Sequence, residues 1–344
     1  MERNLAIESG GKDCSFYSIA GVNVRVECDH PDVHERIREH LAPYRLREKP
    51  QSEQGLAVSI KHGHASSPVP DEAKPVLHYD RLQSFYISGK TFFTDYFSTL
   101  ELDRSGTALT GNLSDRTLED GGPEFFVDLL FNLSLFEGLR FHGLYYLHAA
   151  ALMGPDGTGY LISGNSGVGK TSLTLSLIEA GYKFLSDDTV FVRLVGDSEV
   201  EVVGFVRDFH LPGDLVSDST EFARFRDLPE YSPYNDKKRL RPDEWFHQKR
   251  ISSMKNPSII LFPEVSDTSE LVPLPKQDAF PRLLPQSLAV MFHPDIAPLH
   301  LESLKRLVNH AGAFQAKLNR SIKGSPAKTR ELFEKARDMA REGA

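Results

Sequence analysis

"GNSGVGKTS" occupies residues 164–172, and more than any other part of the chain it indicates the fold. It contains the pattern G-x-x-x-x-G-K-[ST], met here by Gly164, Gly169, Lys170 and Thr171. Glycines let the backbone turn its N–H groups toward a phosphate chain, the lysine can reach the terminal phosphates, and the threonine hydroxyl can hold Mg²⁺. The alternative is a polar turn that matches the pattern by chance.

The flanking segments favour a phosphate site. YLISG (160–164) has the apolar pattern of a short buried strand, and VGKTSLTLSLIEAG (168–181) has the pattern of an amphipathic helix closed by Gly181. A helix that begins at such a loop adds its positive N-terminal end to the site. We therefore predict that the loop binds the phosphates of a nucleotide through Gly164, Asn165, Ser166, Gly167, Val168, Gly169, Lys170, Thr171 and Ser172.

Two adjacent acids follow the helix. Asp187 and Asp188 end the strand-like segment YKFLSDD (182–188). In P-loop proteins an acid at the end of a neighbouring strand holds the Mg²⁺ shell. A second carboxylate beside an acceptor hydroxyl can take its proton during phosphoryl transfer. We expect the two acids to divide these roles, the alternative being that Asp188 only caps a turn.

Other polar residues are weaker candidates. His148 ends an apolar run in LYYLHAAAL, where a satisfied core histidine is the commoner case. Arg207 follows a strand-like segment and could steady transferred charge, although a surface ion pair is an equal alternative. A basic cluster could clamp phosphate or an acidic partner, or simply be a solvated surface; it consists of Lys237, Lys238, Arg239, Arg241, Lys249 and Arg250.

In combination these motifs resemble the HPr kinase/phosphorylase family and its relatives, which have a phosphoenolpyruvate carboxykinase-like P-loop fold. The resemblance rests on His148, then GNSGVGKTS, then Gly181 and FLSDDTV, and it is close over residues 144–195. LHAAALMGPDGTGYLISG looks more like the broad group of HPr-kinase-related proteins, some of which phosphorylate a serine in a precursor peptide. Residues 1–120 do not resemble the usual N-terminal domain of those enzymes, and residues 213–300 lack a clear match to the segment used for phosphorolysis and subunit contact.

The resemblance implies a role for each site residue. Lys170 would contact the β and terminal phosphates of ATP, and Thr171 would hold Mg²⁺ with Asp188 near the metal. Asp187 would be the general base that accepts the serine hydroxyl proton, with His148 beside it. Arg207, a candidate from its position after a strand-like segment, completes the expected catalytic set. The family's tendency to oligomerise allows a homo-oligomer.

Composition limits the class of protein. The 344 residues carry a net charge of −8, with 40% hydrophobic and 26% charged residues, as a folded protein of one or two domains would. A mildly acidic chain is a poor candidate for a general nucleic-acid binder. No apolar run approaches the roughly 20 residues that span a bilayer. Two cysteines and an N-terminus without an apolar h-region favour a cytoplasmic protein. From the charge and the apolar runs we expect that it binds neither nucleic acid nor membrane.

The pattern along the chain predicts an α/β protein with an α+β N-terminal lobe. We expect a mixed domain over 1–122, a connecting helix over 123–143, a P-loop domain on a mixed sheet over 144–300, and a helical tail over 301–344. SFYSIAGVNVRVEC (15–28) reads as one half-buried strand, residues 271–286 as irregular, and 299–318 as helix.

The leading hypothesis is an ATP-dependent kinase acting on a serine of a small protein or peptide, or on a small-molecule alcohol. The alternative is a nucleotide-binding regulatory or scaffold protein without transfer activity. Retention of Lys170, Thr171, Asp187 and Asp188 favours the kinase, because a decayed relative would be expected to lose one of them. A GTPase ranks last, because NDKK (235–238) does not fit the guanine-recognition pattern N-K-x-D.

Overall fold

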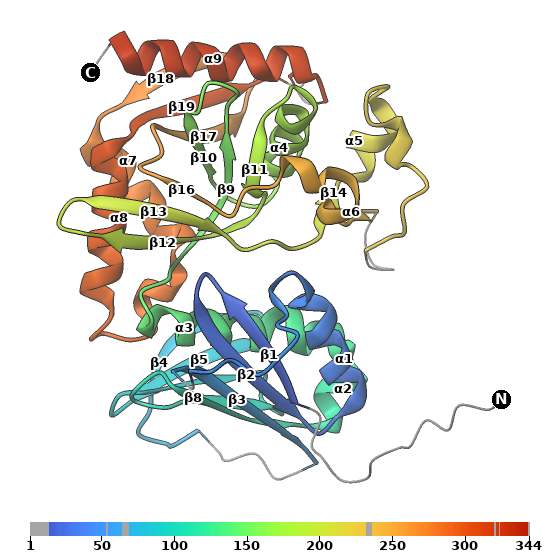
Figure 1. The fold of residues 1–344 in the computed structure, drawn as a ribbon, viewed down its shortest axis with the longest axis vertical. Helices are drawn as coiled ribbons and strands as arrows, with labels where there is room; N and C mark the ends of the chain where they lie inside the picture. Colours follow the sequence, from blue (N-terminus) through green and yellow to red (C-terminus); the bar gives the residue numbers. More distant parts are fainter. Residues whose placement is uncertain are drawn as a thin grey trace. The chain divides into compact units, whose positions relative to one another are not determined.

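The computed structural model describes residues 14–52, 54–63, 69–231, 236–319, 321–322 and 324–342. The chain divides into two compact units, the first made of residues 1–143 and 291–297, the second of residues 144–290 and 298–344. Each unit combines a sheet with helices, so the mixed α/β class expected from the sequence is confirmed (Figure 1).

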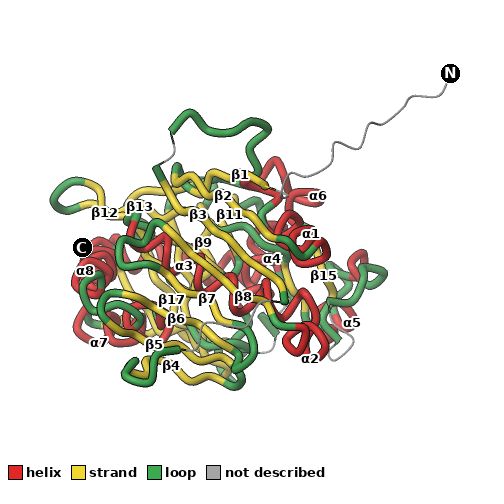
Figure 2. The backbone as a smooth tube through the Cα atoms, turned by 90° about the horizontal axis from the view of Figure 1, so that it is seen from below, coloured by secondary structure: helices red, strands yellow, loops and turns green. Residues whose placement is uncertain are grey.

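The first unit is built on an eight-stranded mixed sheet. Its strands lie side by side in the order β1-β2-β3-β8-β7-β6-β5-β4 (Figure 2). The pairs β2–β3 and β3–β8 are parallel, and the other pairs are antiparallel. The strands are β1 Cys14–Ile19, β2 Val22–Cys28, β3 Gly55–His62, β4 Lys74–Tyr79, β5 Leu82–Ile87, β6 Lys90–Thr94, β7 Thr99–Leu102 and β8 Ala108–Leu113.

The predicted single strand over 15–28 is wrong, because the chain reverses within it. Ala20 and Gly21 both have positive φ, 51° and 86°, and β1 pairs antiparallel with β2 on either side of them. Two successive left-handed residues are what a tight type I′ hairpin requires. Apolar and polar residues alternate in the same way in one long strand and in two short paired strands, so the alternation does not reveal the turn at Ala20 and Gly21.

Helices cover one face of this sheet. They are α1 Pro31–His40, the short 3₁₀ helix η1 Ala42–Tyr44, and a run made of α2 Asp115–Phe125, the π-helical η2 Phe126–Phe131 and α3 Asn132–Phe141. The segment expected as a connecting helix over 123–143 is helical as far as Phe141, as part of this longer run, and it belongs to the first unit. At Gly138 a Cβ would lie 2.7 Å from the Leu56 side chain, so α3 and β3 approach closely there.

Residues 291–297 pack into the first unit although they follow the second in sequence. The ring of Phe292 meets that of Phe93 at 5.2 Å, and His293 Nε2 donates to the carbonyl of Gly89 at 3.2 Å.

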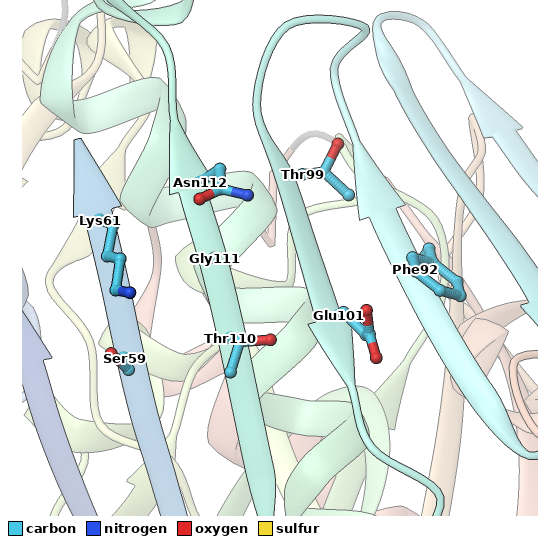
Figure 3. Close-up of a pocket in the computed structure, with 8 residues that line it drawn as sticks. All are labelled: Ser59, Lys61, Phe92, Thr99, Glu101, Thr110, Gly111 and Asn112. Carbon is cyan, nitrogen blue, oxygen red and sulfur yellow. The ribbon is translucent and has the colours of Figure 1, made fainter. Parts of the chain in front are cut away.

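On β3, β7 and β8, polar side chains line a pocket of about 290 Å³, among them Lys61 and Asn112 (Figure 3). The lining of this pocket is thus mainly polar.

The second unit is built on a nine-stranded mixed sheet. Eight strands follow the order β16-β13-β12-β9-β10-β17-β19-β18, and β11 pairs with β9 off this path. Among the strands that the structure describes here, β10–β17 and β17–β19 pair in parallel and the other pairs are antiparallel, which confirms the expected mixed sheet. The strands are β9 Tyr145–Met153, β10 Gly159–Ser163, β11 Lys183–Ser186, β12 Thr189–Val195, β13 Glu199–Gly204, β16 Ser253–Lys255, β17 Ile259–Val265, β18 Glu270–Leu274 and β19 Gly312–Leu318.

Alternating side chains of this sheet supply two apolar cores. Leu152, Tyr160 and Ile162 face α4 Lys170–Glu179 and α9 Pro326–Glu342. Ala151 and Leu161 face α7 Lys276–Leu283 and α8 Ala297–His310. The remaining elements are the two-stranded ribbon β14 Phe209–Leu211 and β15 Lys238–Leu240, the helices α5 Gly213–Asp218 and α6 Pro242–Phe246, and the 3₁₀ turns η3 Ala223–Phe225, η4 His247–Lys249, η5 Leu284–Gln286 and η6 Leu288–Met291.

Two predictions for the C-terminal part are wrong. Residues 271–286 are regular, with β18 ending at Leu274 and α7 beginning after Pro275. Residues 312–318 are strand β19 and not helix, although the helical prediction holds for α8 and α9. Ala, Gln and Lys in GAFQAKL favour a helix locally, but pairing with β17 on one side and β18 on the other overrides that preference.

None of the helices among the described residues is both long and apolar enough to serve as a membrane-spanning segment.

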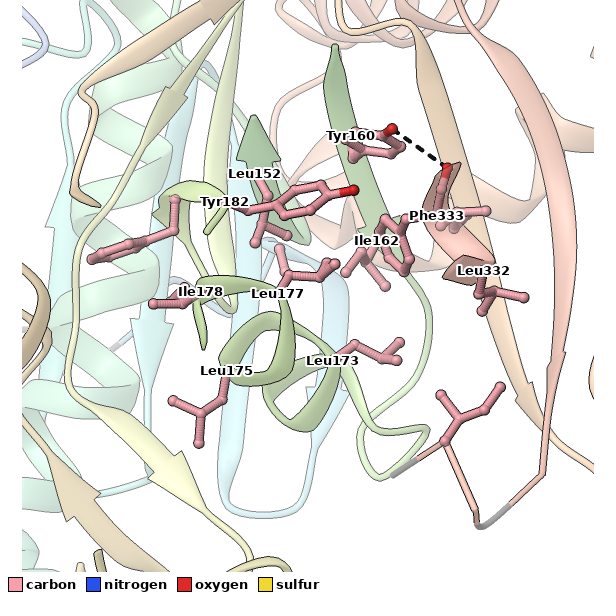
Figure 4. Close-up of a cluster of buried hydrophobic side chains, with 14 of the residues drawn as sticks. Leu152, Tyr160, Ile162, Leu173, Leu175, Leu177, Ile178, Tyr182, Leu332 and Phe333 are labelled. Atoms are coloured by element: carbon pink, nitrogen blue, oxygen red, sulfur yellow. Dashed lines mark hydrogen bonds between the residues drawn. The ribbon is translucent and has the colours of Figure 1, made fainter. Parts of the chain in front are cut away.

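The packing of α9 on the second unit's sheet can be tested at Phe333, which is fully buried (Figure 4). Its ring meets those of Tyr160 and Tyr182 at 5.2 and 6.4 Å. Phe333→Ala should lower the free energy of unfolding by about 3–5 kcal/mol, because burial is lost and a cavity remains. The measurement is urea denaturation. The exposed Lys335→Ala on the same helix is the control, expected within about 0.5 kcal/mol of wild type; equal effects of the two variants would contradict the packing.

Candidate active site

The loop 164–169 joins β10 to α4, so the strand and helix expected around it are confirmed. Gly167 and Gly169 have φ values of 87° and 99°, in the left-handed region that favours glycine. Gly169 is the residue before the first turn of α4, and it places the loop's backbone at the helix N-terminus. The local sequence therefore places a glycine-rich turn at the positive end of a helix dipole.

The helix behind the loop is buried on all sides, which differs from the amphipathic helix expected. Residues 172–178 are all buried, because the sheet lies on one side and α9 on another. The helix ends as predicted at Gly181, whose φ is 97° and whose N–H donates to the carbonyl of Ile178. A fully packed helix holds the loop at its N-terminus in one position.

Lys170 is folded back onto the loop. Its Nζ donates to the carbonyl oxygens of Gly164 at 2.7 Å and Asn165 at 3.0 Å. The side chain is only 6% exposed, and burial lowers the pKa of the ammonium, an effect that the charges of Asp188 and Asp187 oppose. A cation thus lies inside the loop, near two carboxylates.

A turn between β11 and β12 carries the two acids, and Ser186 shapes it. The Ser186 hydroxyl donates to the carbonyl of Phe205 at 3.0 Å and accepts from the backbone N–H groups of Thr189 at 3.1 Å and Asp188 at 3.3 Å. Such side chain to backbone bonds fix a turn locally. Because β11 has just ended, the two successive carboxylates are not forced to opposite faces of the sheet.

Asp187 faces the loop side of this turn. Its Oδ2 accepts from Thr171 Oγ1 at 3.0 Å, and the residue is 3% exposed. Its Oδ1 is buried, with no hydrogen-bond partner among the described residues. Burial first, and then the charge of Asp188, raise the pKa of Asp187 to about 8. A buried carboxylate with an unmatched oxygen favours the approach of a cation.

Asp188 faces a different set of groups. His148 Nδ1 lies 3.2 Å from Asp188 Oδ1 and 3.0 Å from its carbonyl oxygen, so Nδ1 carries the proton. Thr189 Oγ1 donates to Asp188 Oδ2 at 3.1 Å, and Arg207 lies 3.9 Å from the same oxygen. Burial alone would raise the pKa of Asp188, but the hydrogen bond from His148 and the charges of His148 and Arg207 bring it well below its usual range. The side chain is 39% exposed.

These contacts correct two expectations that came from the resemblance. His148 was expected beside Asp187, but its partner is Asp188, because β9 and β12 pair with His148 opposite Thr189. Likewise the hydroxyl of Thr171, expected to act with Asp188, contacts Asp187. Arg207 lies 3.9 Å from the carboxylate of Asp188, a contact that both of its alternatives allow. The order of strands in the sheet decides these pairings, and no local pattern encodes it.

Most of the basic cluster is engaged within the unit. Arg239 pairs with Asp208, Lys238 with Glu230, Arg241 with Glu244, and Arg250 with Asp243. Lys249 donates to the carbonyl of Ile178. Surface pairs of this kind contribute little stability each. Because each of these five cations already has a partner within the unit, their contacts do not support the alternative in which the cluster clamps a phosphate.

One residue beside the loop was missed by the sequence analysis. Gln286, the last residue of η5, is 7% exposed, and its Nε2 donates to Asn165 Oδ1 at 2.8 Å. It follows a proline in a stretch expected to be irregular, and 121 positions separate it from Asn165. No signal in the sequence joins the two.

Comparison with known proteins supports the resemblance. No family model matches the chain. Over 98 residues it is 29% identical to an HPr kinase/phosphorylase from Chlorobium phaeovibrioides (strain DSM 265 / 1930), which is 27% of this chain and 30% of that relative. The chain thus spans less than a third of the relative's length. The predicted resemblance to the HPr kinase/phosphorylase-related family is confirmed over that stretch.

A structural comparison gives the HPr(Ser) kinase/phosphatase from Coxiella burnetii, at 11% identity and a TM-score of 0.26, covering 55% of this chain and 98% of that one. A TM-score this low carries no argument about the fold.

The role of Ser186 in shaping the acidic turn can be tested directly. Ser186→Ala removes one donor and one acceptor in a buried site and leaves the carbonyl of Phe205 and two N–H groups without that partner. We expect the free energy of unfolding to fall by about 1–3 kcal/mol, measured by thermal or urea denaturation. Ser198→Ala, in an exposed turn, is the matched control and should have almost no effect. A neutral Ser186→Ala would mean that the turn holds its shape without the hydroxyl.

Proposed function

We propose that this chain is an ATP-dependent kinase of HPr-kinase type. It transfers the γ-phosphoryl group to a hydroxyl, either a serine of a small protein or peptide or a small-molecule alcohol. The observation that carries the proposal is the division of the two adjacent acids, with Asp187 bonded to Thr171 beside the loop and Asp188 bonded to His148. A site with one carboxylate for a metal and one for an acceptor is what phosphoryl transfer to an alcohol requires.

The loop supplies the donor side. The glycine turn, the N-terminus of α4 and Lys170 together favour a chain of phosphates. In the absence of nucleotide, Lys170 is held by the carbonyls of Gly164 and Asn165, and both bonds would be exchanged for phosphate oxygens on binding. The loop would grip the phosphates, and nothing in it selects the base.

The residues present fit Mg²⁺. Thr171 offers a hydroxyl, and Asp187 a buried oxygen without a partner among the described residues. Mg²⁺ in nucleotide sites typically uses one or two protein oxygens and completes its shell with phosphates and water. When bound, the metal would neutralise charge that develops on the transferred phosphoryl group. Thr171 and Asp187 would hold it, and its charge would favour the ionised form of Asp187.

The contacts of the two acids favour the reverse of the roles that the resemblance implied for them. We assign Asp188, not Asp187, to the acceptor, because its carboxylate is partly exposed and hydrogen-bonded to His148, whereas Asp187 is buried against Thr171. His148 would orient this carboxylate through the proton on Nδ1. Arg207, 3.9 Å from the same carboxylate, would face the charge of the transferred group.

In the transfer step the acceptor hydroxyl oxygen forms a bond to the γ-phosphorus as the bond to the bridging oxygen of ADP breaks. The hydroxyl proton passes to the carboxylate of Asp188. A low pKa makes Asp188 a weak base, which suffices where the transition state is loose and the proton moves late. Lys170 and Arg207 would stabilise the charge on the phosphoryl oxygens, so catalysis would come mainly from positioning and electrostatics.

Two variants separate the roles of the acids. Asp188→Asn should reduce transfer of labelled γ-phosphate to a serine-containing acceptor by at least about 10³-fold, while the affinity for ATP with Mg²⁺ stays within about twofold. Asp187→Asn should instead abolish the strengthening of ATP binding by Mg²⁺ and leave Mg²⁺-free binding in place. The measurements are transfer assays against a panel of acceptors and calorimetric titrations with and without Mg²⁺.

Each variant controls for the other, because both replace a carboxylate by an amide of the same shape in one turn. If Asp187→Asn abolished transfer with its Mg²⁺ response intact, the base would be Asp187, as the resemblance implied. Tight Mg²⁺-dependent ATP binding with no transfer to any acceptor would favour the regulatory or scaffold alternative.

A further inference from the structure

We propose that Gln286 is a positioning residue. It sets whether the oxygen or the nitrogen of the Asn165 side-chain amide is available to a phosphate bound at the loop. The proposal rests on the proposed nucleotide binding at residues 164–172. It concerns one hydrogen bond, from Gln286 Nε2 to Asn165 Oδ1 at 2.8 Å. Asn165 is the second residue of the loop, and its backbone carbonyl already accepts a bond from Lys170.

The chemistry of the amide makes the direction of this bond important. An asparagine side chain has an oxygen that only accepts and a nitrogen that carries two donors. Because Gln286 donates to Oδ1, the acceptor side of Asn165 is occupied and its Nδ2 is turned away from Gln286. An anion needs donors, so in this orientation the Asn165 side chain has its donor nitrogen available for a phosphate. The opposite orientation would present the amide oxygen, which would repel a phosphate.

Burial makes Gln286 suitable for holding that orientation, whereas Asn165 is exposed. Gln286 ends the helical run α7–η5, which is anchored in the sheet's core through Ala279 and Leu283. A buried amide on a packed element loses little further freedom when it forms the bond. An exposed asparagine on a glycine-rich loop would otherwise sample both orientations. With the nitrogen of Gln286 facing it, the bond selects the orientation that turns Oδ1 toward Gln286.

Three variants test the proposal through binding of ATP and of inorganic triphosphate, measured by calorimetry. Gln286→Leu removes the donor and should weaken both ligands about tenfold, which corresponds to about 1.4 kcal/mol. Gln286→Glu should weaken them further, because a carboxylate accepts from Asn165 Nδ2, reverses the amide and adds negative charge. Gln277→Leu, the same substitution at an exposed position of α7, is the control and should bind like wild type.

The decisive comparison is a double-mutant cycle with Asn165→Ala. If Gln286 acts only through the Asn165 amide, Gln286→Leu should change affinity less than about twofold in the Asn165→Ala background. An undiminished tenfold effect in that background would overturn the proposal, as would Gln286→Glu binding as tightly as wild type. Thermal denaturation of each variant excludes loss of fold as the cause.

The outcome separates this inference from the function on which it rests. If wild type fails to bind ATP and triphosphate, the proposed function fails. If wild type binds both and Gln286→Leu binds equally well, the nucleotide site stands and the role of Gln286 is contradicted.

Discussion

The site depends on the antiparallel pairing of β9 with three other strands. β9 pairs with β10, which leads into the glycine loop, and with both β11 and β12, which flank the acidic turn. The same strand carries His148, opposite Thr189. One strand therefore fixes the distances among the loop, the two acids and the histidine. Any change in the register of β9 would separate Lys170 and Thr171 from Asp187 and His148 from Asp188 together.

Within this arrangement of strands, the groups around Asp187 and Asp188 give the two carboxyls different pKa values. Asp187 and Asp188 are adjacent in sequence, but burial raises the pKa of the first, and a histidine and an arginine lower that of the second. Like charges this close favour one protonated and one ionised carboxyl. A metal ion would change the balance at Asp187 and leave Asp188 ionised, so both acids would be anionic only in the loaded site. On the proposed function, the binding of nucleotide, the binding of metal and the protonation of the two acids would therefore depend on one another.

The sequence predicts local features well and long-range contacts poorly. The loop 164–169, its strand, its helix and the end at Gly181 follow from glycine positions and apolar spacing, which are properties of neighbouring residues. The partner of His148 could not be read from the chain, because strand order and register place it. Gln286 was missed for the same reason. Strand β19 was taken for helix because pairing on both its sides overrides the preference of its residues. Motifs thus located the site, and topology assigned partners within it.

The central claim is that the loop binds a nucleotide through Lys170, and equilibrium titration of the full chain with ATP and Mg²⁺ tests it most directly. We expect one ATP per chain for wild type and a loss of affinity of at least about 100-fold, about 2.7 kcal/mol, for Lys170→Met, which keeps most of the length of the side chain without its charge. Circular dichroism would establish that the variant folds. Equal ATP affinity in wild type and Lys170→Met, or no ATP binding by wild type, would contradict the account.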